Sequence, residues 1–311
     1  DTPPAAMSSS SNKTLSAIPS TQFTTPSRPL TFLVTGCSSG LGLALCRAIQ
    51  SAGHILIATS RNPSRTPSLV SEIEGAGGRW LPLDVDSPDA GKTLIDELEE
   101  SGTAVDVLIN NAGWSIHHAV EQFDEAEVRD QFETVFFGPY RVIRAAAPRM
   151  RTRRFGVVVN ISSGAGLEGR ETMGVYAGAK AAMDGVCKVL AKEVAEFNVR
   201  VITAYLGTFG TNMINAVRIG AAPLADDYQG TTVHDMINVV STGALRPAGD
   251  ADKAAKVIVD VVLGVGAGEG RQGETALPLG PDVLPRLELV RDRMVHALEV
   301  FGAAAESTRA D

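Results

Sequence analysis

The sequence contains little cysteine and few aromatic residues, and it has no long apolar run. Among its 311 residues are three cysteines, Cys37, Cys46 and Cys187, which are far apart and form no CxxC pair. An odd, scattered set argues against a disulfide framework and against a cysteine zinc site. We therefore expect a reducing, cytoplasmic environment. Because no apolar run approaches the roughly 18 residues of a spanning helix, we expect no membrane partner.

Positive charge is also scarce. The chain has 28 Lys+Arg against 36 Asp+Glu, a formal net charge of −8. Nucleic-acid binding requires a basic surface, so we expect no nucleic-acid partner. With 44% hydrophobic and 21% charged residues, the composition is typical of a soluble globular protein with a large core.

The two ends of the chain differ in composition from its middle. Residues 1–29 are rich in Ser, Thr and Pro and contain almost no consecutive apolar residues. Such a segment cannot bury enough apolar surface to offset the entropy of ordering, so we predict a disordered tail at 1–29. A single folded domain is predicted at 30–301, followed by a second disordered tail at 302–311.

Between these tails, apolar runs alternate with helical patterns. Runs rich in Val, Ile and Leu, bounded by Gly, Pro or polar residues, occur at 31–35, 54–60, 79–85, 105–112, 155–163 and 200–207. This alternation predicts an α/β fold with a parallel sheet that is covered on both faces. Residues 208–249 form a long, polar, irregular segment, which we expect to be a loop that shapes the substrate pocket.

A glycine-rich turn follows the first apolar run, and it supports two chemistries. As a dinucleotide loop, Gly36, Gly40 and Gly42 let the backbone approach a pyrophosphate at the N-terminus of the next helix. The same residues, Gly36-Cys37-Ser38-Ser39-Gly40, also match the G-x-S-x-G elbow of hydrolases. That elbow requires several earlier strands and an oxyanion loop, whereas only the tail precedes the apolar run that leads into this turn. A glycine turn that merely packs is a third interpretation of this motif alone.

Four motifs together resemble the short-chain dehydrogenase/reductase family. They are Thr35-Gly36-x-x-x-Gly40-x-Gly42, Asn110-Asn111-Ala112-Gly113, a serine at Ser163, and Tyr176-x-x-x-Lys180. Their order and spacing agree with the family over roughly residues 29–211. The resemblance implies one Rossmann-type domain with a doubly wound parallel sheet of about seven strands. It also implies NAD(P)(H) as cofactor, a small-molecule substrate, and a homodimer or homotetramer.

The resemblance assigns catalysis to Ser163, Tyr176 and Lys180. Tyr176 and Lys180 are four residues apart and share one face of a helix. A lysine cation beside a phenol lowers the phenol pKa, so we expect Tyr176 to act as general acid or base. Ser163 would bind the substrate oxygen. Ser162 is the alternative serine, but the 13-residue spacing to the tyrosine in relatives selects Ser163.

The end of the second apolar run predicts the cofactor. NAD enzymes carry an acid there that binds the ribose hydroxyls, whereas this chain has Ser60-Arg61-Asn62. Arg61, assisted by Ser39, suits the 2′-phosphate of NADP(H), unless Arg61 is only a solvated surface charge. The resemblance implies the following cofactor-binding residues: Thr35, Gly36, Ser38, Ser39, Gly40, Leu41, Gly42, Arg61, Asp84, Val85, Asn111, Ala112, Gly113, Tyr176, Lys180, Gly207, Phe209 and Thr211.

The chain departs from the family at two positions. Aligning Gly138 places Val135 where relatives have a catalytic asparagine that supports a proton-relay water. Leu206 stands where relatives usually have proline before Gly207, which leaves that turn less restrained. Backbone carbonyls near Gly138-Pro139 are the alternative support for the water.

Three functions follow from these residues. The first is an NADP(H)-dependent oxidoreductase that interconverts a ketone and a secondary alcohol on an apolar small molecule. The second, which the departures at Val135 and Leu206 suggest, is an isomerase, dehydratase or cyclase of secondary metabolism that retains the nucleotide site. The third is a nucleotide-binding sensor, which the complete Ser-Tyr-Lys set disfavours.

His117 and His118 follow the asparagine motif and border the pocket, but they form no metal-binding pattern, so no metal is expected.

Overall fold

A seven-stranded parallel sheet forms the centre of the protein. The structure is a computed structural model that describes residues 23–210 and 217–310. The strand order is β3-β2-β1-β4-β6-β7-β9. The strands are β1 Thr31–Val34, β2 Ile55–Ser60, β3 Arg79–Pro82, β4 Val107–Asn110, β6 Gly156–Ser163, β7 Val199–Leu206 and β9 Ala276–Leu279. The expected α/β, Rossmann-type doubly wound sheet is therefore confirmed.

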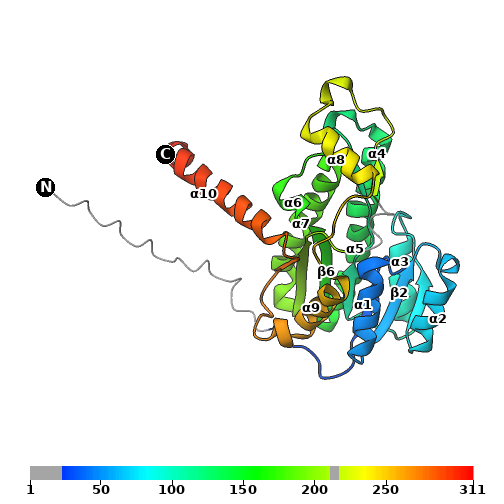
Figure 1. Cartoon of the computed structure of the whole chain (residues 1–311). Helices are drawn as coiled ribbons and strands as arrows, with labels where there is room; N and C mark the ends of the chain where they lie inside the picture. The colour runs from blue at the N-terminus through cyan, green and yellow to red at the C-terminus, as the bar shows by residue number, and fades with distance from the viewer. Residues whose placement is uncertain (1–22, 211–216, 311) are drawn as a thin grey trace.

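Helices cover both faces of this sheet (Figure 1). One apolar cluster joins one face to α1 Gly40–Ser51, α2 Pro67–Gly75 and α9 Ala251–Leu263. A second cluster joins the other face to α3 Ala90–Glu100, α5 Gly138–Arg153 and α7 Gly174–Val194. Successive residues of a strand point to opposite faces. Val157 and Val159 of β6 accordingly belong to the first cluster and Val158 to the second, which explains the nearly continuous apolar runs.

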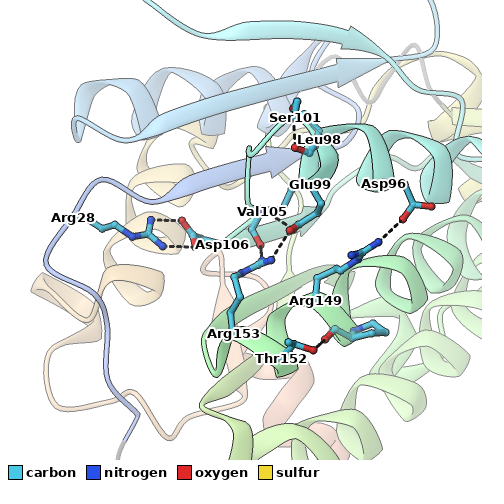
Figure 2. A network of polar contacts seen from close by, with 11 residues as sticks. Arg28, Asp96, Leu98, Glu99, Ser101, Val105, Asp106, Arg149, Thr152 and Arg153 are labelled. Carbon is cyan, nitrogen blue, oxygen red and sulfur yellow. Dashed lines mark hydrogen bonds and ion pairs between the residues drawn. The ribbon is translucent and has the colours of Figure 1, made fainter.

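The chain is fixed to the body before β1 begins. The Arg28 guanidinium donates two hydrogen bonds, of 2.6 and 2.8 Å, to the carboxylate of Asp106, as Figure 2 shows. Asp106 is 1% exposed and also accepts the backbone N–H of Thr31 at 2.9 Å. The predicted disordered tail at 1–29 is therefore wrong at its C-terminal end, because a buried carboxylate provides a partner there. Residues 1–22 lie outside the described residues.

The last helix, α10 Leu284–Glu306, extends away from the body (Figure 1). None of its residues is buried. We expected a disordered tail at 302–311, but residues 302–306 continue the helix, since alanine at 303–305 strongly favours helix. In the part of the chain that the structure describes, no helix combines the length and apolar character needed to cross a bilayer.

The segment 208–249 is more regular than we expected. It contains β8 Val217–Ile219, which pairs in parallel with β5 Ser115–His117, and α8 Thr232–Ser241. Thr231 precedes α8, and its side chain accepts the N–H of His234 as an N-cap. The prediction of an irregular loop is therefore wrong for these two elements. Residues 211–216 lie outside the described residues.

Candidate active site

The predicted site residues gather at the carboxyl ends of the parallel strands. The glycine turn follows β1, Arg61 follows β2, Asp84 and Val85 follow β3, residues 111–113 follow β4, and Gly207 and Phe209 follow β7. The strand order reverses between β1 and β4, and ligands of open α/β sheets bind at such a switch point. Thr211 was also predicted to bind the cofactor, but it lies outside the described residues.

Two glycines of the turn are required by close backbone approach. Gly36 has φ +73°, and a Cβ there would lie 2.8 Å from the Cα of Ala112. A Cβ on Gly42 would lie 2.2 Å from the carbonyl oxygen of Gly36. The turn is therefore tight and lies at the N-terminus of α1, where a phosphate fits. The remaining predicted residues of this turn are Ser38 and Ser39, both half-buried, with Gly40 and Leu41 beginning the helix.

Thr35 and Asn111 connect the glycine turn to the end of β4. The Thr35 hydroxyl accepts the backbone N–H groups of Asn111 and Ala112, both at 3.0 Å. In return, the Asn111 side-chain amide donates to the carbonyl oxygens of Thr35 and Gly36 at 2.9 and 3.1 Å. These two side chains bond to protein groups, so they shape the turn rather than project into it.

The two candidate serines at the end of β6 point to different partners. The Ser162 hydroxyl is buried and donates to the carboxylate of Asp184 on α7 at 2.9 Å. Ser163 lines a cavity together with Tyr176. Its hydroxyl oxygen accepts the backbone N–H of Ala165 at 3.2 Å. The structure therefore brings Ser163, and not Ser162, to the cavity beside the tyrosine.

Tyr176 lies on α7 and is 6% exposed. We expected Lys180 to lower its pKa, but burial raises the pKa of Tyr176 to about 12, although hydrogen bonding with Ser163 opposes the rise. The physical reason is the burial of the phenol, to which the Asp184 charge adds a smaller effect in the same direction. The Lys180 ammonium lies 5.7 Å from the centre of the Tyr176 ring and donates to the carbonyl of Ile161 at 2.6 Å.

Lys180 itself is strongly affected by its surroundings. Burial lowers its pKa to about 8, and the nearby Asp184 carboxylate opposes that change. Its titration therefore falls near neutral pH, which is a common property of functional groups.

Val135 lies beside the candidate catalytic residues, where the alignment predicted it. It is 2% exposed and packs in an apolar cluster with Tyr176 and Ala179. Residues Glu133–Phe137 form a single π-helical segment before α5. Pro139 follows this segment and has no N–H, so it cannot donate to the carbonyl of Val135 four residues earlier. This irregularity agrees with the expected break in the helix near Gly138-Pro139.

The turn after β7 is restrained by a residue from the far end of the chain. The carboxylate of Asp282 accepts the backbone N–H of Thr208 at 2.9 and 3.1 Å and the Thr208 hydroxyl at 2.8 Å. A Cβ on Gly207 would lie 2.0 Å from Asp282 Oδ1. Asp282 thus supplies a restraint where Leu206 replaces the family proline. Sequence reasoning missed this residue, because no local motif connects positions 208 and 282.

The cavity in front of Ser163 and Tyr176 has a mainly apolar wall with a few polar groups. Segment 208–249, which we expected to shape the pocket, contributes several of its walls. The lining residues are Ser115, His117, Ser163, Ala165, Arg170, Met173, Tyr176, Gly207, Thr208, Phe209, Val217, Val240, Gly243, Leu245, Pro247 and Arg286.

The two histidines after the asparagine motif have different surroundings. His117 lines the cavity, and burial lowers its pKa to about 4, with a smaller effect from the Arg170 charge, so it is neutral at pH 7. His118 is buried; its Nδ1 accepts the N–H of Ala119, and its Nε2 lies 2.8 Å from the carbonyl of Ala222. Within residues 23–210 and 217–310, no three His, Cys, Asp or Glu side chains gather as a metal site would need.

A strained segment between α6 Ala165–Glu168 and α7 borders the cavity. Thr172 has φ +67°, a left-handed conformation that a β-branched residue rarely adopts. Its hydroxyl lies 2.9 Å from His117 Nδ1, and its carbonyl accepts the N–H of His118 at 2.9 Å. These contacts fix the backbone between Arg170 and Met173, which both line the cavity. Sequence reasoning missed Arg170, since it belongs to none of the motifs.

Arg61 is exposed at the end of β2, and the described residues give its guanidinium no hydrogen-bond acceptor. The residues that follow the strand, Asn62 and Pro63, are not acidic. Val85 is buried, and a Cβ on Gly138 would lie 2.8 Å from its carbonyl oxygen. Gly113 is exposed beside Lys180 and Val135. The cofactor residues predicted along four strand ends therefore border one edge of the sheet.

Comparison with known proteins identifies similar chains. A family model described as short chain dehydrogenase matches residues 30–221. Oxidoreductase claN of Passalora fulva is 38% identical over 205 residues, which are 65% of this chain and 92% of that protein. The crystal structure of a short-chain dehydrogenase from Streptomyces avermitilis is 31% identical, with a TM-score of 0.80, and covers 90% of this chain and 100% of its own.

Two more distant structures contain different nucleotides. A gluconate 5-dehydrogenase from Burkholderia cenocepacia, in complex with NADP and tartrate, is 23% identical, with a TM-score of 0.66 over 82% of this chain and 94% of its own. A short chain dehydrogenase/reductase from Burkholderia phymatum, in complex with NAD, is 21% identical, with a TM-score of 0.71 over 88% of this chain and 95% of its own. At these identities the likeness shows the fold alone.

The contacts of Asp282 lead to a prediction about the turn after β7. Asp282→Ala removes every hydrogen bond that its carboxylate accepts from Thr208, so unfolding should require about 1–3 kcal/mol less free energy in urea titrations. Hydrogen exchange over residues 206–210 should become faster. Asp292→Ala, an exposed acid of α10, is the matched control and should change neither measurement. Unaltered exchange over 206–210 in Asp282→Ala would contradict the restraint.

Proposed function

The chain belongs to the short-chain dehydrogenase/reductase family of oxidoreductases, and we propose that it interconverts a ketone and a secondary alcohol of an apolar small molecule with NADP(H). The observation that carries this proposal is the mainly apolar cavity lined by both Ser163 and Tyr176. A carbonyl that enters this cavity meets two hydroxyl groups at one wall. The apolar remainder of the cavity suits the rest of such a substrate.

We assign the proton transfer to Tyr176. With a pKa near 12, the phenol is protonated at neutral pH and suited to donate a proton to a developing alkoxide. The Ser163 hydroxyl, at the same wall, would donate a hydrogen bond to the substrate oxygen and stabilise its charge. When bound, the nicotinamide nucleotide supplies or accepts the hydride. In the alcohol direction Tyr176 must lose its proton, and the positive charge of Lys180 favours the phenolate.

We propose that the nucleotide is NADP(H). The tight turn at Gly36 and Gly42 lies at the N-terminus of α1, where backbone N–H groups would bind the pyrophosphate. Arg61 carries a charge that a 2′-phosphate would pair with, and the absence of an acid after β2 supports this choice. Ser39, half-buried in the glycine turn, is the expected second donor.

The non-redox alternative, an isomerase, dehydratase or cyclase, is not favoured. One of its two grounds is the turn after Leu206, which is less restrained without the family proline, but Asp282 restrains that turn. The other, Val135, removes an amide from the site but leaves Ser163 and Tyr176 beside one cavity. A small-molecule substrate suits this family, while the homodimer or homotetramer and the cytoplasmic location stay predictions.

Arg61→Ala tests the cofactor preference. The native protein should bind NADPH more tightly than NADH, and the variant should lose about 1 kcal/mol or more of binding free energy for NADPH only, since a charge-assisted contact is lost. Calorimetric titration of both nucleotides measures this. Arg65→Ala, an exposed arginine four residues later, is the control. Equal affinity of the native protein for both nucleotides would overturn the assignment.

Tyr176→Phe tests the proton donor. The variant should lose turnover of a ketone panel, followed by NADPH absorbance, because the side chain keeps its shape but has no proton to donate. Nucleotide affinity should be largely retained. Tyr140→Phe removes a hydroxyl from another partly buried tyrosine and should leave turnover unchanged. Substantial turnover by Tyr176→Phe would show that the proton comes from another group.

The pKa of Lys180 predicts the pH dependence of the reaction. In reduction, Tyr176 becomes a phenolate as it donates its proton, and the Lys180 ammonium stabilises that phenolate. Because burial lowers the pKa of Lys180 to about 8, the ammonium loses its charge as the pH rises through that value, and kcat/KM for reduction should fall there. Asp184→Asn removes the carboxylate that opposes the lowering, so the fall should move to lower pH. Asp292→Asn should leave the profile unchanged. An alkaline limb that stays in place in folded Asp184→Asn would exclude Lys180 as its source.

A further inference from the structure

Arg170 gives the cavity a positive charge that no neighbouring carboxylate pairs with. Its guanidinium has no hydrogen-bond acceptor and no carboxylate within 4.0 Å among the described residues, although the side chain is partly buried at the cavity wall. A desolvated guanidinium without a partner is unfavourable unless an anion enters beside it.

The other charged group of the cavity already has its partners. Arg286 lies 3.1 Å from Asp282 and 3.5 Å from Glu168. Burial and the Arg286 charge lower the pKa of Arg170, whereas the charges of Glu168, Asp282 and Glu171 act in the opposite direction. Arg170 therefore lies close to a second cation that is paired, and it remains the group available to a ligand.

A second, independent feature of the same cavity is an unpartnered hydroxyl. Ser115 is 1% exposed and lines the cavity, yet its Oγ has no hydrogen-bond partner among the described residues. Ser115 and His117 are two residues apart on β5, so their side chains lie on one face of the strand. Arg170 lines the same cavity as these two residues, and its charge adds to the effect of burial in lowering the pKa of His117.

We propose that the substrate of this cavity carries a carboxylate that is bound by Arg170 and Ser115. A planar carboxylate accepts two parallel hydrogen bonds from a guanidinium and retains lone pairs for a hydroxyl. One unpaired cation matches a single negative charge, which favours a carboxylate over a dianionic phosphate. The remaining walls include Met173, Val217, Val240 and Leu245, so the substrate class is an apolar oxo acid.

The strained segment gives Arg170 a defined position. Thr172 keeps its left-handed conformation through its contacts with His117 and His118. Backbone strain of this kind persists only where surrounding contacts maintain it, and it is concentrated at ligand sites. A flexible arginine would lose more entropy on binding than one whose backbone is already held.

The test compares matched acids and esters, and it rests on the proposed ketone reduction. Substrates are 4-acetylbenzoate and 4-oxopentanoate, which differ in the spacing of ketone and carboxylate, with their methyl esters. For at least one pair, the native enzyme should prefer the acid in kcat/KM. Arg170→Gln should lower kcat/KM for that acid about tenfold or more and change the ester less than about twofold. Ser115→Ala should also lower kcat/KM for the acid more than kcat/KM for the ester, but by a smaller factor than Arg170→Gln.

Two controls separate recognition from structure. Arg293→Gln removes the same charge from the exposed face of α10 and should leave kcat/KM for both the acid and the ester unchanged. Arg170→Lys keeps the charge without the planar fork and should recover part of the acid activity. If Arg170 only compensates the charges of Glu168 and Asp282, Arg170→Gln should lower kcat/KM for the acid and for the ester by the same factor. The midpoint of thermal unfolding should then also be lower. That result, or a native preference for every ester, would overturn the proposal.

A binding measurement distinguishes this proposal from the proposed function. Benzoate, which has no ketone, should bind the native protein in calorimetric titrations with NADP+ present, and Arg170→Gln should bind it about tenfold more weakly or not at all. Arg170-dependent benzoate binding without reduction of any ketone would contradict the proposed reaction and retain the carboxylate site. Reduction of the esters without Arg170-dependent benzoate binding would support the proposed reaction and contradict the carboxylate site.

Discussion

The pairing of β6 with β7 is the constraint on which the site depends. The two strands pair over eight residues each, from Gly156 opposite Val199 to Ser163 opposite Leu206. The register continues into the loops, since the N–H of Gly164 donates to the carbonyl of Leu206 at 2.9 Å. A shift by one residue would exchange the faces of every side chain on β6. This pairing therefore determines that Ser163 ends its strand beside the turn at Gly207.

A buried polar network transfers this order from the sheet to α7. Asp184 accepts the hydroxyl of Ser162 at 2.9 Å, and the Lys180 ammonium donates to the carbonyl of Ile161 at 2.6 Å. Both contacts join α7 to the last residues of β6. Buried polar groups are costly when unpaired and specify one arrangement when paired. Tyr176, on the same helix, is thereby held at a fixed distance from Ser163, and the cost of burying Lys180 appears as its lowered pKa.

Local patterns in the sequence predict the sheet and the motif residues, but not the contacts between distant segments. The apolar runs predict the strands because both faces of the sheet are buried, and the Tyr176-x-x-x-Lys180 spacing predicts a shared helix face. No spacing predicts that Asp282 bonds to Thr208, because that contact depends on how β9 and the segment before α10 are placed. The pKa of Tyr176 was predicted wrongly for a related reason. Charge proximity is visible in the motif, whereas the direction of the Lys180 ammonium and the depth of burial are not.

The departures from the family pattern have different physical consequences. Leu206 lacks the fixed φ of the proline that relatives have there. The Asp282 carboxylate restrains Thr208 instead, so tertiary hydrogen bonds hold the turn in place. Val135 has no such replacement: its side chain packs against Tyr176 and leaves the region apolar. Pro139, four residues later, has no N–H and so removes the α-helical donor to the carbonyl of Val135. The two departures therefore differ: a carboxylate from a distant segment replaces the restraint at Leu206, whereas the side chain at Val135 stays apolar.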